Sequence, residues 1–390
     1  MVEVDYLYSR IKEYGTKLIA GAGGITNPVK WFHIMEGVEI SPFLEQYSIV
    51  FTTGIALQDS KDLIQLIKKQ QEKGTSAAII NLGPHIYKIP QEVIDFCNEK
   101  EYPLFTVPWN VKLPHLMKVF GTILTEAERS DRALADALKN AVLFPIEEDM
   151  YKPTLIRYGF DRDSRYGVVV FHYSDNQDEI DKMEHITTAM QQLVKFYSEK
   201  ILVVCTKLGW LVLFTDCSNK KIISIVEKIL NLLNGWKTNC FAGIGNSQKG
   251  MTNIFKSYKE ALNALEVRSA IVPDQGYMEY SEIGVYQLLL NVEDEKVIQA
   301  YCEKFVGVLY RYDQKFNTNF MELLFEYLES DCSIKRVSEK FFMHRNTVYY
   351  QLQKIQELLQ CDFHDVKVKV QIYLALCYYR LKKKKIEVEF

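Results

Sequence analysis

The sequence lacks the features that direct a chain into a membrane or a secretory pathway. No apolar run approaches the roughly 18 residues that are needed to span a bilayer. Residues 1–5 carry neither the basic segment nor the apolar segment of a secretory signal. Apolar residues make up 48% and charged residues 25% of the chain, which is the balance of an ordinary globular protein. We therefore expect a cytoplasmic protein without a membrane partner.

Metal-binding motifs are also missing. The eight cysteines are scattered without a CxxC pair, and no second close pair accompanies Cys361 and His364. Zinc sites bring Cys and His ligands together at short spacings. The sequence therefore predicts reduced thiols, several of them small core side chains, and neither a metal nor another cofactor.

The motifs of common enzyme classes are absent as well. The sequence has no GxGxxG, GxxxxGK[ST], HExxH or GxSxG. Residues 21–24 read Gly-Ala-Gly-Gly, but no Lys-Ser or Lys-Thr pair follows, so we interpret them as a turn. Cys97 and His115 have no visible catalytic partner. We expect a protein that is not an enzyme and has no catalytic residues.

Length and charge distribution both indicate several domains. A chain of 390 residues is too long for one ordinary core. The formal charge is −3, but residues 331–390 hold 12 Lys and Arg against 7 Asp and Glu, a net of +5 that leaves −8 for residues 1–330. A basic terminal module on an acidic body is typical of a DNA-binding domain joined to sensing domains. Four of these positive charges, at 382–385, are equally compatible with a solvated tail.

Residues 1–127 alternate short apolar runs with helical patterns. Strands are expected at 17–20, 30–35, 49–53, 77–82 and 104–107, and helices at 61–73 and 91–100. Strands that are separated by helices predict an α/β domain with a mainly parallel sheet. A long helix at 113–143 and a break between Pro145 and Pro153 make residues 128–160 a connecting helix and linker.

Residues 161–290 predict a second α/β domain. Strands are expected at 166–173, 201–206, 211–215 and 239–245, helices at 180–199, 221–233 and 254–269, and a hairpin turn at 207–210. Two β-α-β halves on one antiparallel sheet predict a ferredoxin-like arrangement. After a loop at 273–276 only helices are expected, at about 284–291, 294–314, 319–329, 333–341, 345–359 and 366–384. Residues 291–390 are thus predicted to be all-α.

The last of these regions contains the most informative motif. Residues 333–341 predict a short helix with Val337 and Phe341 on its inner face and with a small residue, Ser338, where a second helix crosses closely. A turn at 342–344 follows, with Met343 between the two helices. This pattern predicts a helix-turn-helix domain with its core at 319–384.

The second helix of the motif divides into a packing face and a polar face. Val348, Leu352 and Ile355 recur at i, i+4 and i+7 and form one apolar stripe. Arg345 suits a bidentate contact with guanine and Asn346 one with adenine, whereas the other polar residues suit phosphates or groove walls. The predicted DNA contacts are Arg345, Asn346, Thr347, Tyr349, Tyr350 and Lys354. An ordinary amphipathic helix pair is the alternative interpretation.

Residues 344–352, which read HRNTVYYQL, resemble the C-terminal domain of the PucR/CdaR family of bacterial regulators. Residues 355–358 (IQEL) and the apolar helix at 366–381 extend the resemblance. Tyr349 and Gln351 stand where relatives frequently carry Arg, and Phe342 stands where many such turns have Gly. These departures from the family pattern imply a DNA reader that relies less on phosphate charge and whose operator cannot be transferred from a relative.

The resemblance covers the other two domains. Residues 29–36, 49–54, 89–90 and 102–108 resemble the PucR-type sensory domain. Residues 241–246, 257–262 and 280–284 resemble the degenerate GGDEF-like domain of the same family. The hairpin at 206–210 (TKLGW) lacks the carboxylates with which a nucleotide cyclase holds metal and triphosphate, so metal-assisted phosphoryl chemistry is not expected.

The sensory domain offers a candidate effector site. Residues 52–54, Thr-Thr-Gly, end a buried strand and open a loop, where hydroxyls and a glycine amide suit small anions or carbonyls. An indole, an imidazole and a carboxylate precede them at 31, 33 and 36. The predicted effector contacts are Trp31, His33, Glu36, Thr52, Thr53 and Gly54. The alternative is that the indole and imidazole belong to the core and that residues 52–54 only turn the chain.

These patterns together predict a ligand-responsive transcription regulator. A small-molecule metabolite would bind the sensory domain and change how a homodimer, or a higher homo-oligomer, fits a two-fold operator in double-stranded DNA. The resemblance implies an activator of a catabolic operon for purines, amino acids or related compounds, with RNA polymerase as a further partner. The dimer surface stays open between the helix at 113–143, the middle domain and the tail. The rival hypothesis is a signalling protein whose middle domain binds a nucleotide and whose terminal helices bind a protein.

Overall fold

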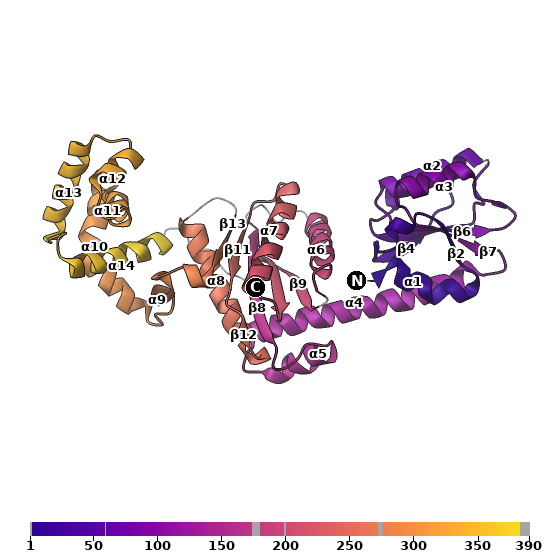
Figure 1. Ribbon diagram of the computed structural model, residues 1–390, viewed down its shortest axis with the longest axis horizontal. Coiled ribbons are helices and arrows are strands. Elements are labelled where there is room, and N and C mark those ends of the chain that lie inside the picture. Colours follow the sequence, from indigo (N-terminus) through magenta and orange to yellow (C-terminus); the bar gives the residue numbers. More distant parts are fainter. Residues whose placement is uncertain (1, 59, 174–179, 199, 272–275, 383–390) are drawn as a thin grey trace. The chain divides into compact units, whose positions relative to one another are not determined.

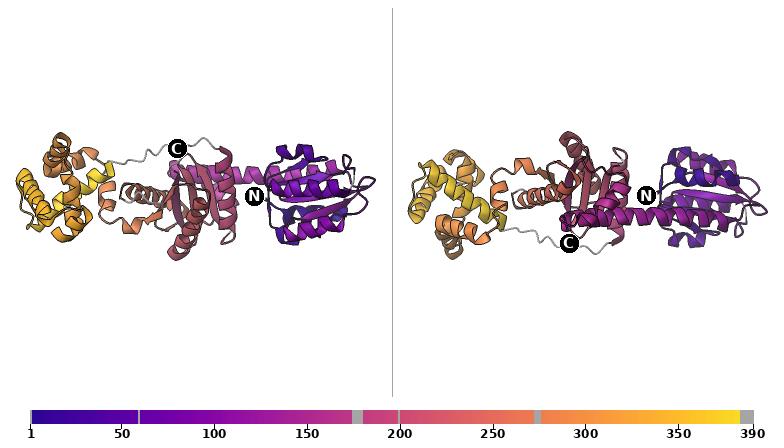
Figure 2. Two further views of the ribbon diagram at one scale, coloured as in Figure 1. Left: turned by 90° about the horizontal axis from the view of Figure 1, so that it is seen from above. Right: turned by 90° about the horizontal axis from the view of Figure 1, so that it is seen from below.

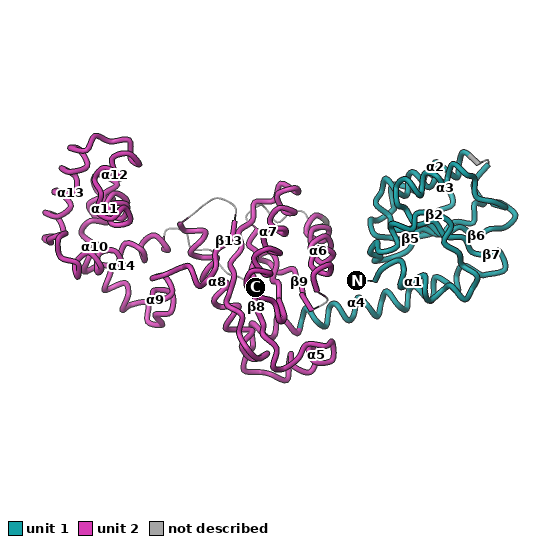
Figure 3. The backbone as a smooth tube through the Cα atoms, viewed as in Figure 1, with its two compact units in different colours: residues 1–136 teal, residues 137–390 magenta. Residues whose placement is uncertain are grey.

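The computed structural model describes residues 2–58, 60–173, 180–198, 200–271 and 276–382 (Figures 1 and 2). The chain divides into two compact units, residues 1–136 and 137–390 (Figure 3). Helix α4 (Leu113–Leu143) crosses this division and has the predicted ends. In the described part of the chain, no helix is both long and apolar enough for a bilayer.

The first unit is built around a five-stranded sheet with the order β2-β7-β6-β5-β4. The strands are β2 (Lys17–Ala20), β4 (Trp31–Ile34), β5 (Ser48–Thr52), β6 (Ala77–Leu82) and β7 (Leu104–Pro108). Strands β4 to β7 are parallel and only β2 pairs antiparallel, which confirms the mainly parallel sheet. A two-stranded ribbon of β1 (Val2–Glu3) and β3 (Pro28–Val29) lies outside this sheet and was not predicted.

Helices cover both faces of this sheet (Figure 1). Val50 of β5 packs in the cluster that includes α2 (Ser60–Glu72) and α3 (Gln91–Glu99). Its neighbours Ile49 and Phe51 pack in the opposite cluster with α1 (Val4–Ile11) and α4. Burial on both faces explains why β5 is apolar without alternation. Because β4 and β5 are parallel, their carboxyl ends meet at one edge of the sheet, beside residues 36 and 52–54.

The second unit begins with the end of α4, continues through α5 (Lys152–Arg157) and then forms a β-α-β-β-α-β domain. Strands β8 (Arg165–Tyr173), β9 (Ile201–Thr206), β10 (Gly209–Thr215) and β11 (Cys240–Ile244) are antiparallel in the order β11-β8-β10-β9. Helices α6 (Ile180–Lys195) and α7 (Asn219–Gly235) pack together on one face. The ferredoxin-like prediction is therefore confirmed.

Helix α8 (Ile254–Ile271) packs directly on β8 and β11. Two glycines of β11 and its end permit this approach. A Cβ atom at Gly243 would lie 2.0 Å from the carbonyl oxygen of Ala261, and one at Gly245 would lie 1.9 Å from that of Ser257. The two glycines of the sequence Phe-Ala-Gly-Ile-Gly at 241–245 are therefore needed for α8 to pack closely on β11.

Two details of this domain differ from the prediction. Strand β13 (Gly276–Glu279) pairs parallel with β11, so the expectation that residue 276 belongs to a loop followed only by helices was wrong. Only two of its four residues, Tyr277 and Met278, are apolar and none is fully buried, so the strand has no apolar run. Residues 273–275 of the expected loop lie outside the described residues. Strand β10 begins at Gly209, so the hairpin turn is shorter than 207–210. A short strand β12 (Gln248–Lys249), also unpredicted, pairs with β8.

The remaining helices share one apolar core, to which Val306, Leu324, Val337, Val348 and Leu376 contribute. They are α9 (Tyr286–Leu290), α10 (Glu295–Phe316), α11 (Phe320–Glu329), α12 (Ile334–Lys340), α13 (Arg345–Leu359) and α14 (Val366–Lys382). Each begins and ends within about two residues of its prediction, and residues 383–384 of the last lie outside the described part. The all-α C-terminal region is thus confirmed.

Candidate nucleic-acid interface and effector site

Helices α12 and α13 form a helix-turn-helix with the predicted inner face. Val337 and Ser338 of α12 are buried, and Phe341 at its end is half-buried. On α13 the stripe of Val348, Leu352 and Ile355 is buried, whereas the intervening positions on the opposite face are exposed. One face of α13 therefore anchors the helix and leaves the other free for a partner.

All six predicted DNA contacts lie on the exposed face of α13. Arg345, Asn346 and Thr347 make up its first turn, which the imidazole of His344 caps by accepting a hydrogen bond from the Asn346 N–H at 3.3 Å. The positive end of the helix dipole adds to the charge of this turn. The remaining predicted contacts, further along the helix, are also exposed: Tyr349, Tyr350 and Lys354.

The exposed face of α13 carries little unpaired charge. The ammonium of Lys354 lies 3.1 Å from the carboxylate of Glu357, and Gln353 donates to the Tyr349 hydroxyl at 3.0 Å. The phenol rings of Tyr349 and Tyr350 meet edge to face at 6.1 Å. This surface is therefore aromatic and polar, with Arg345 as its cation at the helix start.

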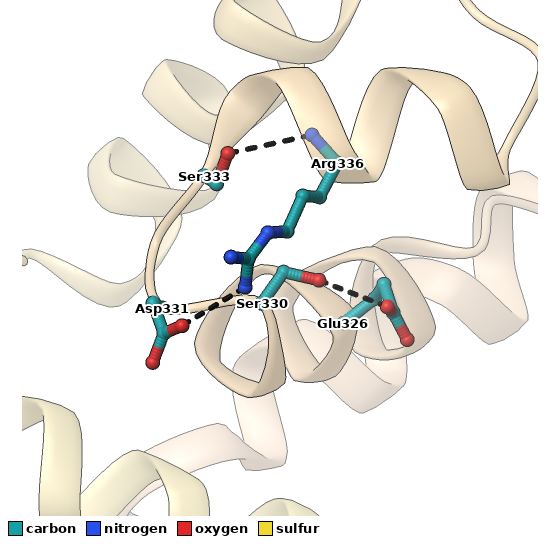
Figure 4. A network of polar contacts seen from close by, with 5 residues as sticks. All are labelled: Glu326, Ser330, Asp331, Ser333 and Arg336. Carbon is teal, nitrogen blue, oxygen red and sulfur yellow. Dashed lines mark hydrogen bonds and ion pairs between the residues drawn. The ribbon is translucent and has the colours of Figure 1, made fainter.

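A polar network fixes α12 relative to α11 (Figure 4). The Arg336 guanidinium donates to Asp331 at 2.9 Å, and the Ser333 hydroxyl caps α12 by accepting from the Arg336 N–H at 3.4 Å. Ser330 donates to the Glu326 carboxylate at 3.0 Å. Glu326, which is nearly buried, also pairs with Lys340 at the other end of α12. None of these positioning contacts was predicted, because they join residues through a turn without a periodic pattern.

A buried carboxylate fixes α11 in turn. Asp313, near the end of α10, accepts hydrogen bonds from the N–H groups of Phe320 at 2.9 Å and Met321 at 2.8 Å. The Thr318 hydroxyl donates to the same side chain at 2.5 Å. Asp313 thus accepts hydrogen bonds from N–H groups in the first turn of α11 that have no acceptor within the helix. These bonds hold the helix-turn-helix on α10.

In the first unit, the carboxylate of Glu36 fills the loop that follows β5. It accepts from the N–H groups of Thr53 (3.0 Å), Gly54 (2.9 Å) and Ile55 (3.3 Å). The hydroxyls of Thr52 and Thr53 donate to it at 3.1 and 2.9 Å. Gly54 has φ = 75°, a left-handed conformation that helps to turn the amides toward one point. We call this set of donors, residues 52–55, the amide nest.

The structure brings four of the six predicted effector residues together, since Glu36 and residues 52–54 form this contact. Trp31 and His33 lie on β4, and the described hydrogen bonds do not join them to the nest. The Trp31 ring is exposed and stacks on Phe32 with a centroid distance of 5.2 Å. His33 is half-buried, and its Nε2 atom has no hydrogen-bond partner among the described residues.

The GGDEF-like hairpin joins β9 and β10 through Lys207 and Leu208, without a carboxylate. Among all described residues, no group of three His, Cys, Asp or Glu side chains is arranged to hold a metal ion.

Comparison with known families assigns all three parts of the chain. The family named PucR, described as purine catabolism regulatory protein-like, matches residues 8–124. The GGDEF-like domain matches residues 155–267, and the PucR C-terminal helix-turn-helix domain matches residues 320–377, which include α12 and α13. The chain belongs to the PucR family. It is a DNA-binding transcriptional regulator, and the family's members are regulators rather than enzymes.

Three regulators of Bacillus subtilis (strain 168) are similar to this PucR-family chain. The proline-responsive transcriptional activator PutR is 25% identical over 324 residues, which cover 80% of this chain and 75% of PutR. The DNA-binding transcriptional activator AdeR is 28% identical over 137 residues, which cover 35% of this chain and 32% of AdeR. The purine catabolism regulatory protein is 28% identical over 168 residues, or 41% of this chain and 30% of that protein.

Proposed function

We propose that this PucR-family regulator activates a catabolic operon in the cytoplasm when a small metabolite binds its first domain. The description of PutR and AdeR as activators supports this sign of regulation. Residues 1–127 would sense the metabolite, 128–160 would connect, 161–290 would act as a spacer and 291–390 would bind DNA. RNA polymerase would then be the partner that an activator recruits or repositions.

The observation that carries the proposal is the two-faced helix α13. Its stripe is buried in the helical core, and its exposed face presents Arg345 and Asn346 at the end where a recognition helix reaches base edges. We assign Arg345 to a guanine and Asn346 to an adenine, because each side chain matches that base bidentately in the major groove. The phosphate and groove-wall contacts are assigned to Thr347, Tyr349, Tyr350 and Lys354.

A homodimer on a two-fold operator completes this proposal. Two copies of α13 would enter major grooves one helical turn apart, about 34 Å, or a multiple of that distance. Sedimentation of the full chain with and without operator measures the stoichiometry, and two chains per operator is the expected result. One chain per operator would refute the dimer.

The effector site is proposed at the amide nest and on β4, with contacts from Trp31, His33, Glu36 and residues 52–54. Five donors already hold one carboxylate there, which supports an effector with a carboxylate or a similar anion. Such an effector would take the place of the Glu36 carboxylate on these donors, and the displaced Glu36 side chain would contact another part of the effector. The proline responsiveness of PutR supports an amino acid as the chemical class.

Transcript levels of the genes beside the operator that this chain binds test the regulatory role. Deletion of the gene for this chain should lower the transcript level of an adjacent catabolic operon. It should also abolish the rise in that transcript level when the effector is added. A rise in those transcripts would show a repressor instead.

A further inference from the structure

Phe342, in the turn between α12 and α13, has an unusual combination of properties. Its side chain is 98% exposed, although phenylalanine is among the residues that fold inward most readily. Its backbone has φ = 53°, in the left-handed region that glycine adopts without strain and bulky residues rarely adopt. Glycine at this position would relieve the backbone strain and remove the exposed ring.

The fold of the turn does not require the phenyl ring. The turn is closed by main-chain hydrogen bonds, from Met343 N–H to the Ser338 carbonyl at 3.0 Å and from Phe341 N–H to the Val337 carbonyl at 2.9 Å. The side chains of Phe341 and Met343, on either side of Phe342, supply the packing against the helical core. The ring of Phe342 is therefore an addition to a turn that is already complete.

The ring lies beside the surface of α13 that we propose binds DNA. Phe342 precedes the cap of α13 by two residues and Arg345 by three, so it stands at the end of the recognition helix that reaches base edges. The neighbouring His344, Arg345 and Asn346 are also exposed. The ring continues an interface that already presents Tyr349 and Tyr350, which are 49% and 69% exposed.

We propose that Phe342 is a specificity-determining DNA contact that packs against the C5-methyl group of a thymine next to the Arg345 contact. A phenyl ring has no hydrogen-bonding group, and the thymine methyl is the apolar group that base edges present in the major groove. Burial of the ring against this methyl occurs only in the complex. The apolar surface that Phe342 exposes in the free protein is thereby removed from water on binding, and the operator is read for thymine at one position. The inference rests on the α13 interface proposed above.

The test compares full-length wild type and F342G on duplexes selected from a random pool by the wild type. Each thymine of the selected operator is replaced in turn by uracil, which lacks only the methyl group. One replacement should weaken wild-type binding roughly fourfold, the equivalent of one buried methyl, and should leave F342G binding unchanged. F342G itself should bind the thymine operator about tenfold more weakly.

Stability and two control variants separate this role from a structural one. F342G should melt at a higher temperature than wild type, because it relieves the left-handed strain. Q360G relieves the same strain at the other end of α13, where φ is 50°, and should raise the melting temperature without a change in DNA affinity. F196A removes a ring that is 87% exposed in the middle domain and should leave DNA binding intact.

Equal methyl sensitivity in wild type and F342G would overturn the inference, as would unchanged affinity of F342G. A change in the sedimentation of F342G without a change in affinity would assign the ring to a second copy of the chain instead. R345A separates the Phe342 contact from the α13 interface as a whole. If R345A weakens binding and F342G does not, only the Phe342 inference fails, whereas indifference of both variants would reject α13 as the interface.

Discussion

Replacement of Arg345 by Ala separates base reading from general attraction to DNA. Arg345 is exposed at the first position of α13, and no ion pair holds it in the described structure. Its loss should change folding stability by no more than about 0.5 kcal/mol, as is usual for a surface substitution. On DNA, a lost bidentate contact with guanine should cost about 1–3 kcal/mol, which corresponds to roughly a 5- to 150-fold loss of affinity.

The contrast with Lys354 sharpens this prediction. The Lys354 ammonium already forms an ion pair with Glu357 at 3.1 Å. A phosphate that contacts Lys354 must therefore compete with this carboxylate for the ammonium. K354A should weaken binding equally for all sequences and lower the salt slope by at most about 0.9, the value for one phosphate. R345A should instead abolish discrimination at one base pair. R311A, which removes an exposed Arg that pairs with Glu303 on α10, is the matched control and should leave DNA binding unchanged.

Fluorescence anisotropy measures these effects on the selected operator and on operators with each base pair changed, at several salt concentrations. The expected result is that R345A binds the wild-type operator and the one mutated at a single guanine with equal affinity. A uniform loss over all operators with a changed salt slope would mean that Arg345 contacts a phosphate. Unchanged affinity would refute the orientation of α13 altogether.

Two further predictions concern Glu36 and Asp313. E36A should lower the melting temperature because it empties the amide nest. Acetate at millimolar concentration should restore part of this melting temperature, whereas neutral acetamide should not. Equal effects of acetate and acetamide would refute the nest as an anion site. D313A should destabilise the helix-turn-helix by about 2–3 kcal/mol, because two N–H groups of α11 lose their acceptor, and D313N should cost less. Hydrogen exchange of the Phe320 and Met321 amides measures this change, and unchanged protection in D313A would contradict the capping role.

The sequence predicted the regular elements well because their patterns are local. The ends of β2, β6 and α4 match their predictions, and the buried stripe of α13 follows from its helical spacing. Strand β13 was missed because only two of its four residues are apolar and because Gly276 was interpreted as the end of a loop. Prediction from local residue patterns misses any strand that forms because it pairs with a neighbouring strand and that has no apolar pattern of its own.

The candidate sites could be predicted only in part. The residue types at Glu36 and 52–54 indicated an anion site, but the sequence does not show that Glu36 itself fills it, since that contact joins two strand ends. Phe342 was marked as a departure from glycine, yet its left-handed backbone and exposure appear only in three dimensions. Asp313 gave no signal at all, because a cap supplied from another helix lies outside the capping motif.

Selection of bound sequences from a random duplex pool, with purified full-length protein at moderate salt, tests the central claim most directly. We predict a two-fold symmetric motif whose half-sites are one helical turn or a multiple apart. Replacement of one guanine in this motif should lower the affinity of the wild type but not that of R345A. Failure of the full chain to bind any duplex, at low as well as moderate salt and with the effector class present, would contradict α13 as a recognition helix.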